Sequence, residues 1–277
     1  CSTAAQKTIS GNNNIGGIVG WNLPTGKLSS CASSANINAS GSYVGGVAGR
    51  NRGTLELTTD TDSTKRTISG TIGVGGVVGY NETGGRLQTV NQTADEVIAV
   101  GSGVTVSGNQ SIGGIVGVNE GTLGMNTTSY LTCQAKRVKA AMGDVGGIVG
   151  RNSGDIYKAI NRSDSVTADT GLAGGITATN DSGNKISDCT DYGNVRSSDG
   201  HAGGIVAKNS GTIQNCTVAN ANGNIVEIYS LGVSENGAIA AVNTNTGLIT
   251  GSSPAGDVKL AGSAVIFGAV TGTNQGT

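Results

Sequence analysis

The residues of this 277-residue chain that could carry out acid–base chemistry are neighbouring carboxylates. They form three pairs, Asp60 with Asp62, Asp95 with Glu96, and Asp188 with Asp191. Two carboxylates on one face could act as general acid and base in the cleavage of a polysaccharide. Each pair lies near an expected turn or loop, however, where carboxylates are normally solvated. We therefore predict no catalytic residue and a protein that is not an enzyme.

The residue types also argue against nucleophilic catalysis and against a metal site. The chain has one histidine, His201, so a serine or cysteine triad would have to use it. The five cysteines include no Cys-x-x-Cys pair, which disfavours a structural zinc site. A calcium-binding solenoid repeat carries Asp after its glycines, whereas aliphatic residues follow here. We expect neither a metal nor a cofactor.

Binding chemistry has one candidate, the basic cluster of Lys136, Arg137 and Lys139. It could contact an acidic glycan, and the alternative is an ordinary solvated loop. The 17 basic and 18 acidic residues give a net charge of −1, so we expect no nucleic-acid partner. No apolar run approaches the roughly 20 residues of a membrane span, so none is predicted.

The composition indicates which structure must position these residues. The chain contains 49 glycines and 2 prolines, and only 13% of its residues are charged and 3% aromatic. Gly, Asn, Ser, Thr and Val together disfavour helix. Collagen is excluded because glycine does not recur at every third position, and the low net charge is not typical of disorder. Aliphatic residues must form the core.

An eight-residue signature recurs nine times, at intervals of about 30 residues. Its first copy is Ile15-Gly-Gly-Ile-Val-Gly-Trp-Asn22. The copies end at Asn22, Asn51, Asn81, Asn119, Asn152, Asn180, Asn209, Asn243 and Asn274. A Gly and then an aliphatic residue follow many copies, as in Gly53-Thr-Leu55, and a looser apolar patch precedes the next copy. Each repeat therefore predicts three short strands joined by polar turns.

Three strands in about 30 residues are typical of one coil of a parallel β-helix. We predict an all-β fold of about nine coils, with residues 1–277 as a single domain. Successive coils pair their backbones at about 4.8 Å, which gives a rod roughly 40 Å long. Two longer repeat spacings predict insertion loops at about 85–110 and 124–142.

Residues at equivalent repeat positions should stack as ladders. The fourth signature position is β-branched in every copy, which suits a pleated inner surface. Its residues are Ile18, Val47, Val77, Ile115, Ile148, Ile176, Ile205, Ile239 and Val270. The closing Asn tolerates a tight corner, and its amide could bond to the Asn one coil away. The first Gly of each pair indicates a bend or close backbone approach.

The pattern [Val/Ile]-Gly-Gly-[Ile/Val]-Val-Gly-x-Asn-x-Gly-x-[Ile/Leu]-x-x-Cys resembles the GLUG-motif repeat of secreted and surface-attached bacterial proteins, including adhesin-like ones. The resemblance spans nearly the whole chain, although copies after Ala173 depart from the pattern. It implies a right-handed β-solenoid in an extracellular or cell-surface bacterial protein, and its motif contains no catalytic residue.

The cysteines and the two ends of the chain raise further expectations. Cys189 and Cys216 occupy equivalent positions in adjacent coils, and we favour free thiols over a disulfide, which stacking would also permit. Cys1 stands where the repeat places its Cys, and the end at Thr277 also falls within a repeat. We expect a segment of a longer polypeptide; the alternative is a lipoprotein whose first mature residue is Cys1.

The leading function is a non-catalytic rod of a bacterial surface adhesin or an extracellular filament. Its partners would be neighbouring coils of the same polypeptide or end-to-end copies of the chain. One alternative is an adhesin that binds a glycan or a host-surface ligand through the insertion loops. The other is a polysaccharide lyase or glycosidase.

Overall fold

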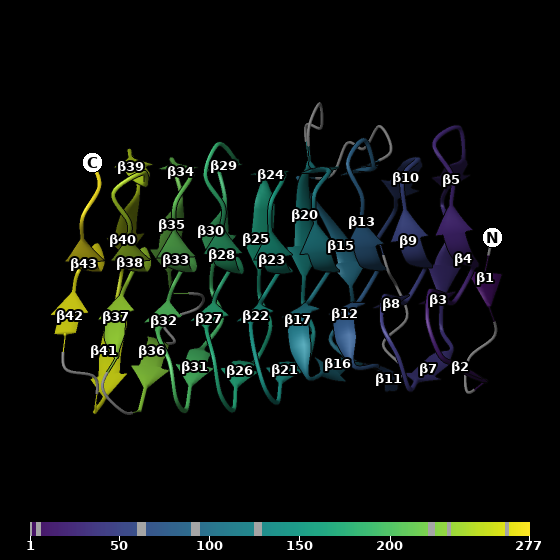
Figure 1. The fold of residues 1–277 in the computed structure, drawn as a ribbon, viewed down its shortest axis with the longest axis horizontal. Helices are drawn as coiled ribbons and strands as arrows, with labels where there is room; N and C mark the ends of the chain where they lie inside the picture. Colours follow the sequence, from purple (N-terminus) through teal and green to yellow (C-terminus); the bar gives the residue numbers. More distant parts are fainter. Residues whose placement is uncertain are drawn as a thin grey trace.

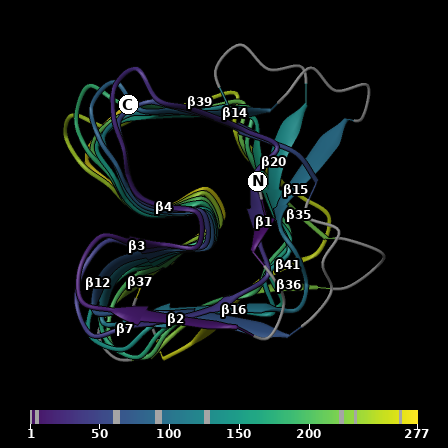
Figure 2. The same cartoon turned by 90° about the vertical axis from the view of Figure 1, so that its right-hand side faces the viewer.

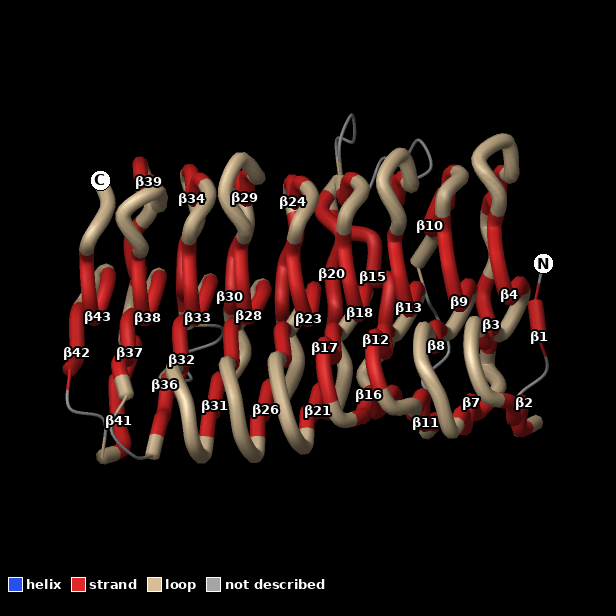
Figure 3. The backbone as a smooth tube through the Cα atoms, viewed as in Figure 1, coloured by secondary structure: helices blue, strands red, loops and turns tan. Residues whose placement is uncertain are grey.

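The computed structural model describes residues 2–3, 7–59, 65–89, 95–124, 129–220, 225–231, 234–263 and 266–277. Cys1, Asp60 and Asp62 lie outside these residues. The described chain contains strands and turns but no helix (Figure 3). Its coils follow one another along the long axis, with the two termini at opposite ends (Figure 1). Every described strand pair is parallel and joins successive coils, so the predicted all-β solenoid is confirmed.

Two nine-stranded sheets are formed by the repeat signature. We call the first the inward sheet; it contains β3 (Ile15–Gly16), β8 (Val44–Gly45), β12 (Ile72–Gly75), β17 (Gln110–Gly113), β22 (Val145–Gly146), β27 (Ala173–Gly174), β32 (Ala202–Gly203), β37 (Glu235–Gly237) and β42 (Ile266–Gly268). We call the second the outward sheet; it contains β4 (Val19–Asn22), β9 (Ala48–Asn51), β13 (Val78–Asn81), β18 (Val116–Asn119), β23 (Val149–Asn152), β28 (Thr177–Asn180), β33 (Val206–Asn209), β38 (Ala240–Asn243) and β43 (Thr271–Asn274).

Three further sheets complete the coil, at the top, side and bottom of Figure 2. The upper sheet contains β5 (Lys27–Ser29), β10 (Thr54–Leu57), β14 (Arg86–Thr89), β19 (Thr122–Leu123), β24 (Asp155–Tyr157), β29 (Lys185–Ser187), β34 (Thr212–Gln214) and β39 (Leu248–Thr250). The side sheet contains β15 (Glu96–Val100), β20 (Tyr130–Cys133), β25 (Ala159–Asn161), β30 (Thr190–Asp191), β35 (Thr217–Ala219) and β40 (Ser253–Ala255); β1 (Ser2–Thr3) pairs separately with β6 (Ala32–Ser33). The lower sheet contains β2 (Thr8–Gly11), β7 (Asn36–Ala39), β11 (Arg66–Ser69), β16 (Val104–Gly108), β21 (Arg137–Ala140), β26 (Val166–Ala168), β31 (Val195–Ser197), β36 (Val226–Ser230) and β41 (Val258–Gly262).

The signature folds differently from the single strand expected for it. In each coil the chain runs inward, turns near the middle of the cross-section and runs outward again (Figure 2). In the second coil these two legs are β8 and β9, and Gly46 and Val47 form the turn. The sheet count therefore exceeds the three strands per coil that were predicted, because the glycine pair ends one short strand and begins a bend.

Glycine is required where the two legs meet. A Cβ on Gly45 would overlap the carbonyl oxygen of Ala48 and lie 2.6 Å from that of Val77. A Cβ on Gly79, on the opposite leg, would overlap the backbone of Tyr43 and Val44. In these coils the inward and outward sheets are thus in backbone contact, with no side chain between them at these positions.

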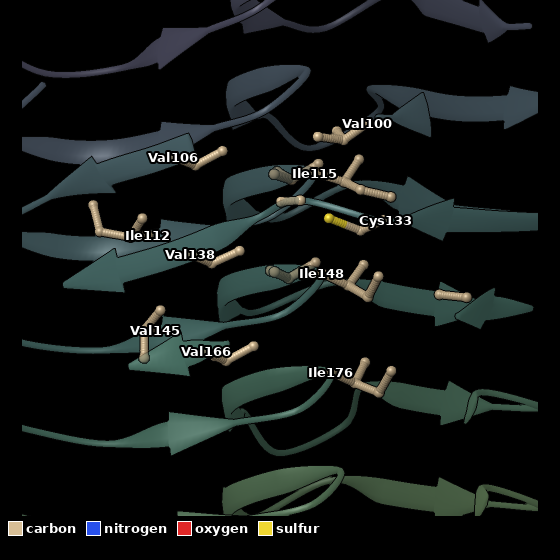
Figure 4. Close-up of a cluster of buried hydrophobic side chains, with 14 of the residues drawn as sticks. Val100, Val106, Ile112, Ile115, Cys133, Val138, Val145, Ile148, Val166 and Ile176 are labelled. Carbon is tan, nitrogen blue, oxygen red and sulfur yellow. The ribbon is translucent and has the colours of Figure 1, made fainter. Parts of the chain in front are cut away.

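The aliphatic turn residues form a column through the centre of the coil. The amide of Val47 donates to the Val77 carbonyl at 2.8 Å, and that of Val77 donates to the Ile115 carbonyl at 2.9 Å. Ile115, Ile148 and Ile176 lie one above another in Figure 4, and all three are fully buried. The bonding pattern runs from Ile18 to Val270, through Ile205 and Ile239.

The two segments expected as insertion loops contain strands of the coil wall. Residues 85–110 include β14, β15 and β16, and residues 124–142 include β20 and β21. These segments form strands because buried residues alternate with more exposed ones. In β16, for example, Val104 and Val106 are buried and Thr105 between them is partly exposed, as in the wall strands of other coils. Residues 90–94 and 125–128 lie outside the described part of the chain.

Candidate functional site

A chain of asparagine side chains runs along the whole rod. Each Asn at the end of an outward strand donates from Nδ2 to the Oδ1 atom of the Asn one coil further on. The N···O distances lie between 2.8 and 3.0 Å from Asn22 to Asn274. In most coils Nδ2 also donates to a nearby glycine carbonyl, as Asn152 does to Gly154 at 2.6 Å. We call this chain the asparagine ladder; it links the closing Asn of all nine signature copies.

Removing one member of the ladder should be costly. In Asn119→Ala, the Asn81 Nδ2 loses an acceptor, and the Asn152 Oδ1 and the Gly121 carbonyl each lose a donor. Each buried polar group left unpaired costs about 1–3 kcal/mol. We expect the free energy of unfolding in urea to fall by about 3 kcal/mol or more. Asn109→Ala is the control, since the Asn109 side chain bonds to no described residue; an equal loss in both variants would contradict a special role for the ladder.

The basic cluster lies on the wall of the rod. Arg137 and Lys139 belong to β21, and Lys136 immediately precedes that strand. Lys139 forms an ion pair with Asp169 at 2.8 Å, whereas Arg137 is exposed. The three residues are therefore held by the lower sheet, and one of the three charges is already partnered.

The candidate carboxylate pairs are not arranged as acid–base pairs among the described residues. Asp188 lies on the outer surface, where the Asn215 amide approaches it at 3.4 Å. Asp191 is fully buried inside the coil, so the wall separates the two groups. Glu96 is held by the guanidinium of Arg162 at 2.7 Å, which lowers the pKa of the Glu96 carboxyl.

Asp191 is the one fully buried carboxylate among the residues that the structure describes, and the sequence did not indicate its burial. Its Oδ1 atom accepts bonds from the Asn161 Nδ2 at 2.7 Å and from the Gly193 amide at 3.1 Å. Its Oδ2 atom has no hydrogen-bond partner in the described chain. Burial raises the pKa of Asp191 to about 8, against the partial compensation of these two bonds. The neutral acid is therefore the form held near pH 7.

The cysteines add no site within the described residues. Cys31, Cys133, Cys189 and Cys216 are free and buried. Burial raises the pKa of the Cys133 and Cys189 thiols, which disfavours the reactive thiolate. No group of three or more His, Cys, Asp or Glu residues in the described part of the chain could hold a metal ion.

An arginine and three aromatic rings form a cluster that sequence reasoning missed. The Arg50 Cζ atom lies 4.8 Å from the ring centroid of Trp21, 5.4 Å from that of Tyr80 and 5.7 Å from that of Tyr43. The two tyrosine rings lie 5.0 Å apart. Arg50 also donates from Nε to Glu82 at 2.7 Å. We call Trp21, Tyr43, Arg50 and Tyr80 the aromatic–arginine cluster.

Neighbouring coils position this cluster. Trp21, Arg50 and Tyr80 all stand one residue before a ladder Asn and pair in register across β4, β9 and β13. Tyr43 comes from the inward leg, immediately before β8, and has a left-handed φ of 61°. Burial and hydrogen bonding to Glu120 raise the pKa of Tyr80, so its hydroxyl stays protonated. The sequence signal that could have revealed the cluster is that Trp21, Arg50 and Tyr80 occupy the same position of the repeat.

An apolar cavity lies at the C-terminal end of the rod. Its volume is about 260 Å³, and its lining includes Pro254, Val258, Leu260 and Phe267. No titratable side chain lines it, so it offers no chemistry beyond apolar contact. The described residues include no helix long and apolar enough to cross a bilayer.

Comparison with known proteins adds no relative: no protein-family model, curated protein or solved structure matches this chain.

Proposed function

We propose that this chain is a non-catalytic structural rod, part of a bacterial surface adhesin or an extracellular filament. The observation that carries the proposal is the asparagine ladder, which continues through every coil alongside the parallel sheets. Pulling two coils apart would break backbone bonds of several sheets and a buried amide bond together. Such a molecule resists both bending and extension, which is what a shaft requires.

Other features support the same role. The buried core is built mainly from Val, Ile, Leu and Ala, and the described carboxylate pairs are separated or already partnered. The coils wind in the right-handed sense in this proposal, as connections between parallel strands of one sheet almost always do. The partners are then neighbouring coils of one polypeptide or end-to-end copies, and the location is extracellular.

Electron microscopy of native material tests the proposal. We expect thin rods in which this region lies coaxially with the rest of the polypeptide, with a length of roughly 40 Å per nine coils. Antibody fragments against the chain should mark the shaft of such rods. Compact particles without a rod would contradict the proposal, and so would turnover of any substrate in a panel of polysaccharides.

A further inference from the structure

The aromatic–arginine cluster has unused binding capacity. The terminal nitrogens of Arg50, Nη1 and Nη2, donate to no group among the described residues, although three rings surround the guanidinium. Trp21 is 47% exposed even with Arg50 over its ring. A ligand at this point would therefore meet both an exposed aromatic surface and unpaired planar donors.

The charges around the cluster select among ligands. Glu82 accepts a bond from Arg50, and Glu120 is hydrogen-bonded to Tyr80, so the cluster is bordered by two carboxylates and contains one guanidinium. This excess of negative charge disfavours an anionic ligand such as an acidic glycan or a phosphate. It favours a neutral ligand that both accepts hydrogen bonds from Arg50 and donates them to carboxylates.

A neutral sugar ring has these properties. Its apolar C–H face can lie on an aromatic ring, and its hydroxyl groups both donate and accept hydrogen bonds. A protein partner with a large apolar anchor would instead need a contiguous apolar surround, which the carboxylates interrupt. We propose that the aromatic–arginine cluster is a binding site for neutral glycans. The site is independent of the rod's mechanical role.

Trp21 provides a direct probe, because it is the only tryptophan of the chain. Methyl glycosides and short oligomers of glucose, galactose, mannose and N-acetylglucosamine would be titrated while its fluorescence is recorded. We expect a saturable change in emission and protection from iodide quenching with at least one neutral sugar. An array that carries neutral and acidic glycans should show binding to the neutral class.

Two variants test the assignment. Trp21→Ala should weaken binding on the array at least tenfold, because it removes the aromatic surface. Arg50→Lys keeps the charge but loses the planar pair of donors, and should weaken binding about tenfold. Phe267→Ala is the matched control: Phe267 is 46% exposed and lies at the other end of the rod. Thermal unfolding of each variant checks that the coil remains intact.

Several outcomes would overturn the proposal. One is the absence of binding to every neutral glycan; another is binding that Trp21→Ala and Arg50→Lys leave unchanged. A third is a preference for acidic glycans that is lost in the triple variant Lys136→Ala, Arg137→Ala, Lys139→Ala, which would place binding on the basic cluster instead. None of these outcomes bears on the rod, which electron microscopy tests separately.

Discussion

Gly113→Ala is expected to destabilise the rod more than any other small substitution considered for it. A Cβ at this position would overlap the carbonyl oxygen of Val116 and lie 2.7 Å from the backbone nitrogen of Gly150. Both obstacles are backbone atoms of the outward sheet, so no side-chain rotation relieves them. We expect the free energy of unfolding, measured by circular dichroism in urea, to fall by more than about 4 kcal/mol, or the chain not to fold.

The chain itself supplies the control for this prediction. On the opposite leg the glycines at 79, 117 and 150 are followed by Ala178 and Ala207 in later coils, so in those two coils this position accepts a methyl group. Ala178→Gly should therefore cost only about 1 kcal/mol, from added backbone freedom and lost burial. A Gly113→Ala variant as stable as Ala178→Gly would show that the two sheets can separate at little cost.

The stacking of successive coils could be predicted from the sequence, because residues at equivalent repeat positions lie over one another when the coils pair in register. The asparagine column and the aliphatic column both depend only on that register. The first Gly of each pair was expected to mark a bend or a close backbone approach, and the structure shows both. The inward direction of the turn was not foreseen, since Gly-Gly between aliphatic residues fits a strand and a bend equally well. Only the opposing leg, which brings Gly79 against Tyr43 and Val44, distinguishes the two.

Candidate sites were predicted less well than the fold, for a geometric reason. Trp21, Arg50 and Tyr80 share one repeat position, so register alone places them together. Tyr43 joins them across the inward turn, which no spacing along the chain reveals. Asp188 and Asp191 are three residues apart, but Asp188 lies at a left-handed corner between β29 and β30 and faces outward, whereas Asp191 ends β30 and faces the core.

Asp191 should make the stability of the rod depend on pH. An aspartate in an unfolded chain has a pKa of about 3.9, whereas that of the buried Asp191 is about 8. Between these values the folded state holds a proton that the unfolded state has released. The free energy of unfolding therefore falls as pH rises from about 4 to about 8, by up to about 1.4 kcal/mol per pH unit, and this contribution is constant outside that window.

Asp191→Asn should remove this dependence. The amide is nearly isosteric with the neutral acid, and its oxygen can still accept from Asn161 and the Gly193 amide. We expect the variant to match the parent chain within about 1 kcal/mol at pH 4 and to exceed it by several kcal/mol at pH 8, on the order of the full linkage. Urea unfolding at half-unit pH steps would measure both curves.

Asp188→Asn is the matched control for that experiment, since it makes the same chemical change three residues away on the outer surface. Asp188 has a left-handed φ of 56°, a conformation that Asn also tolerates, so the backbone should not change. Its stability curve should run parallel to that of the parent chain. Because the coil wall separates Asp188 from Asp191, flat curves in both variants would mean that the pH dependence does not arise from the buried carboxyl. A steep curve that persists in Asp191→Asn would lead to the same conclusion.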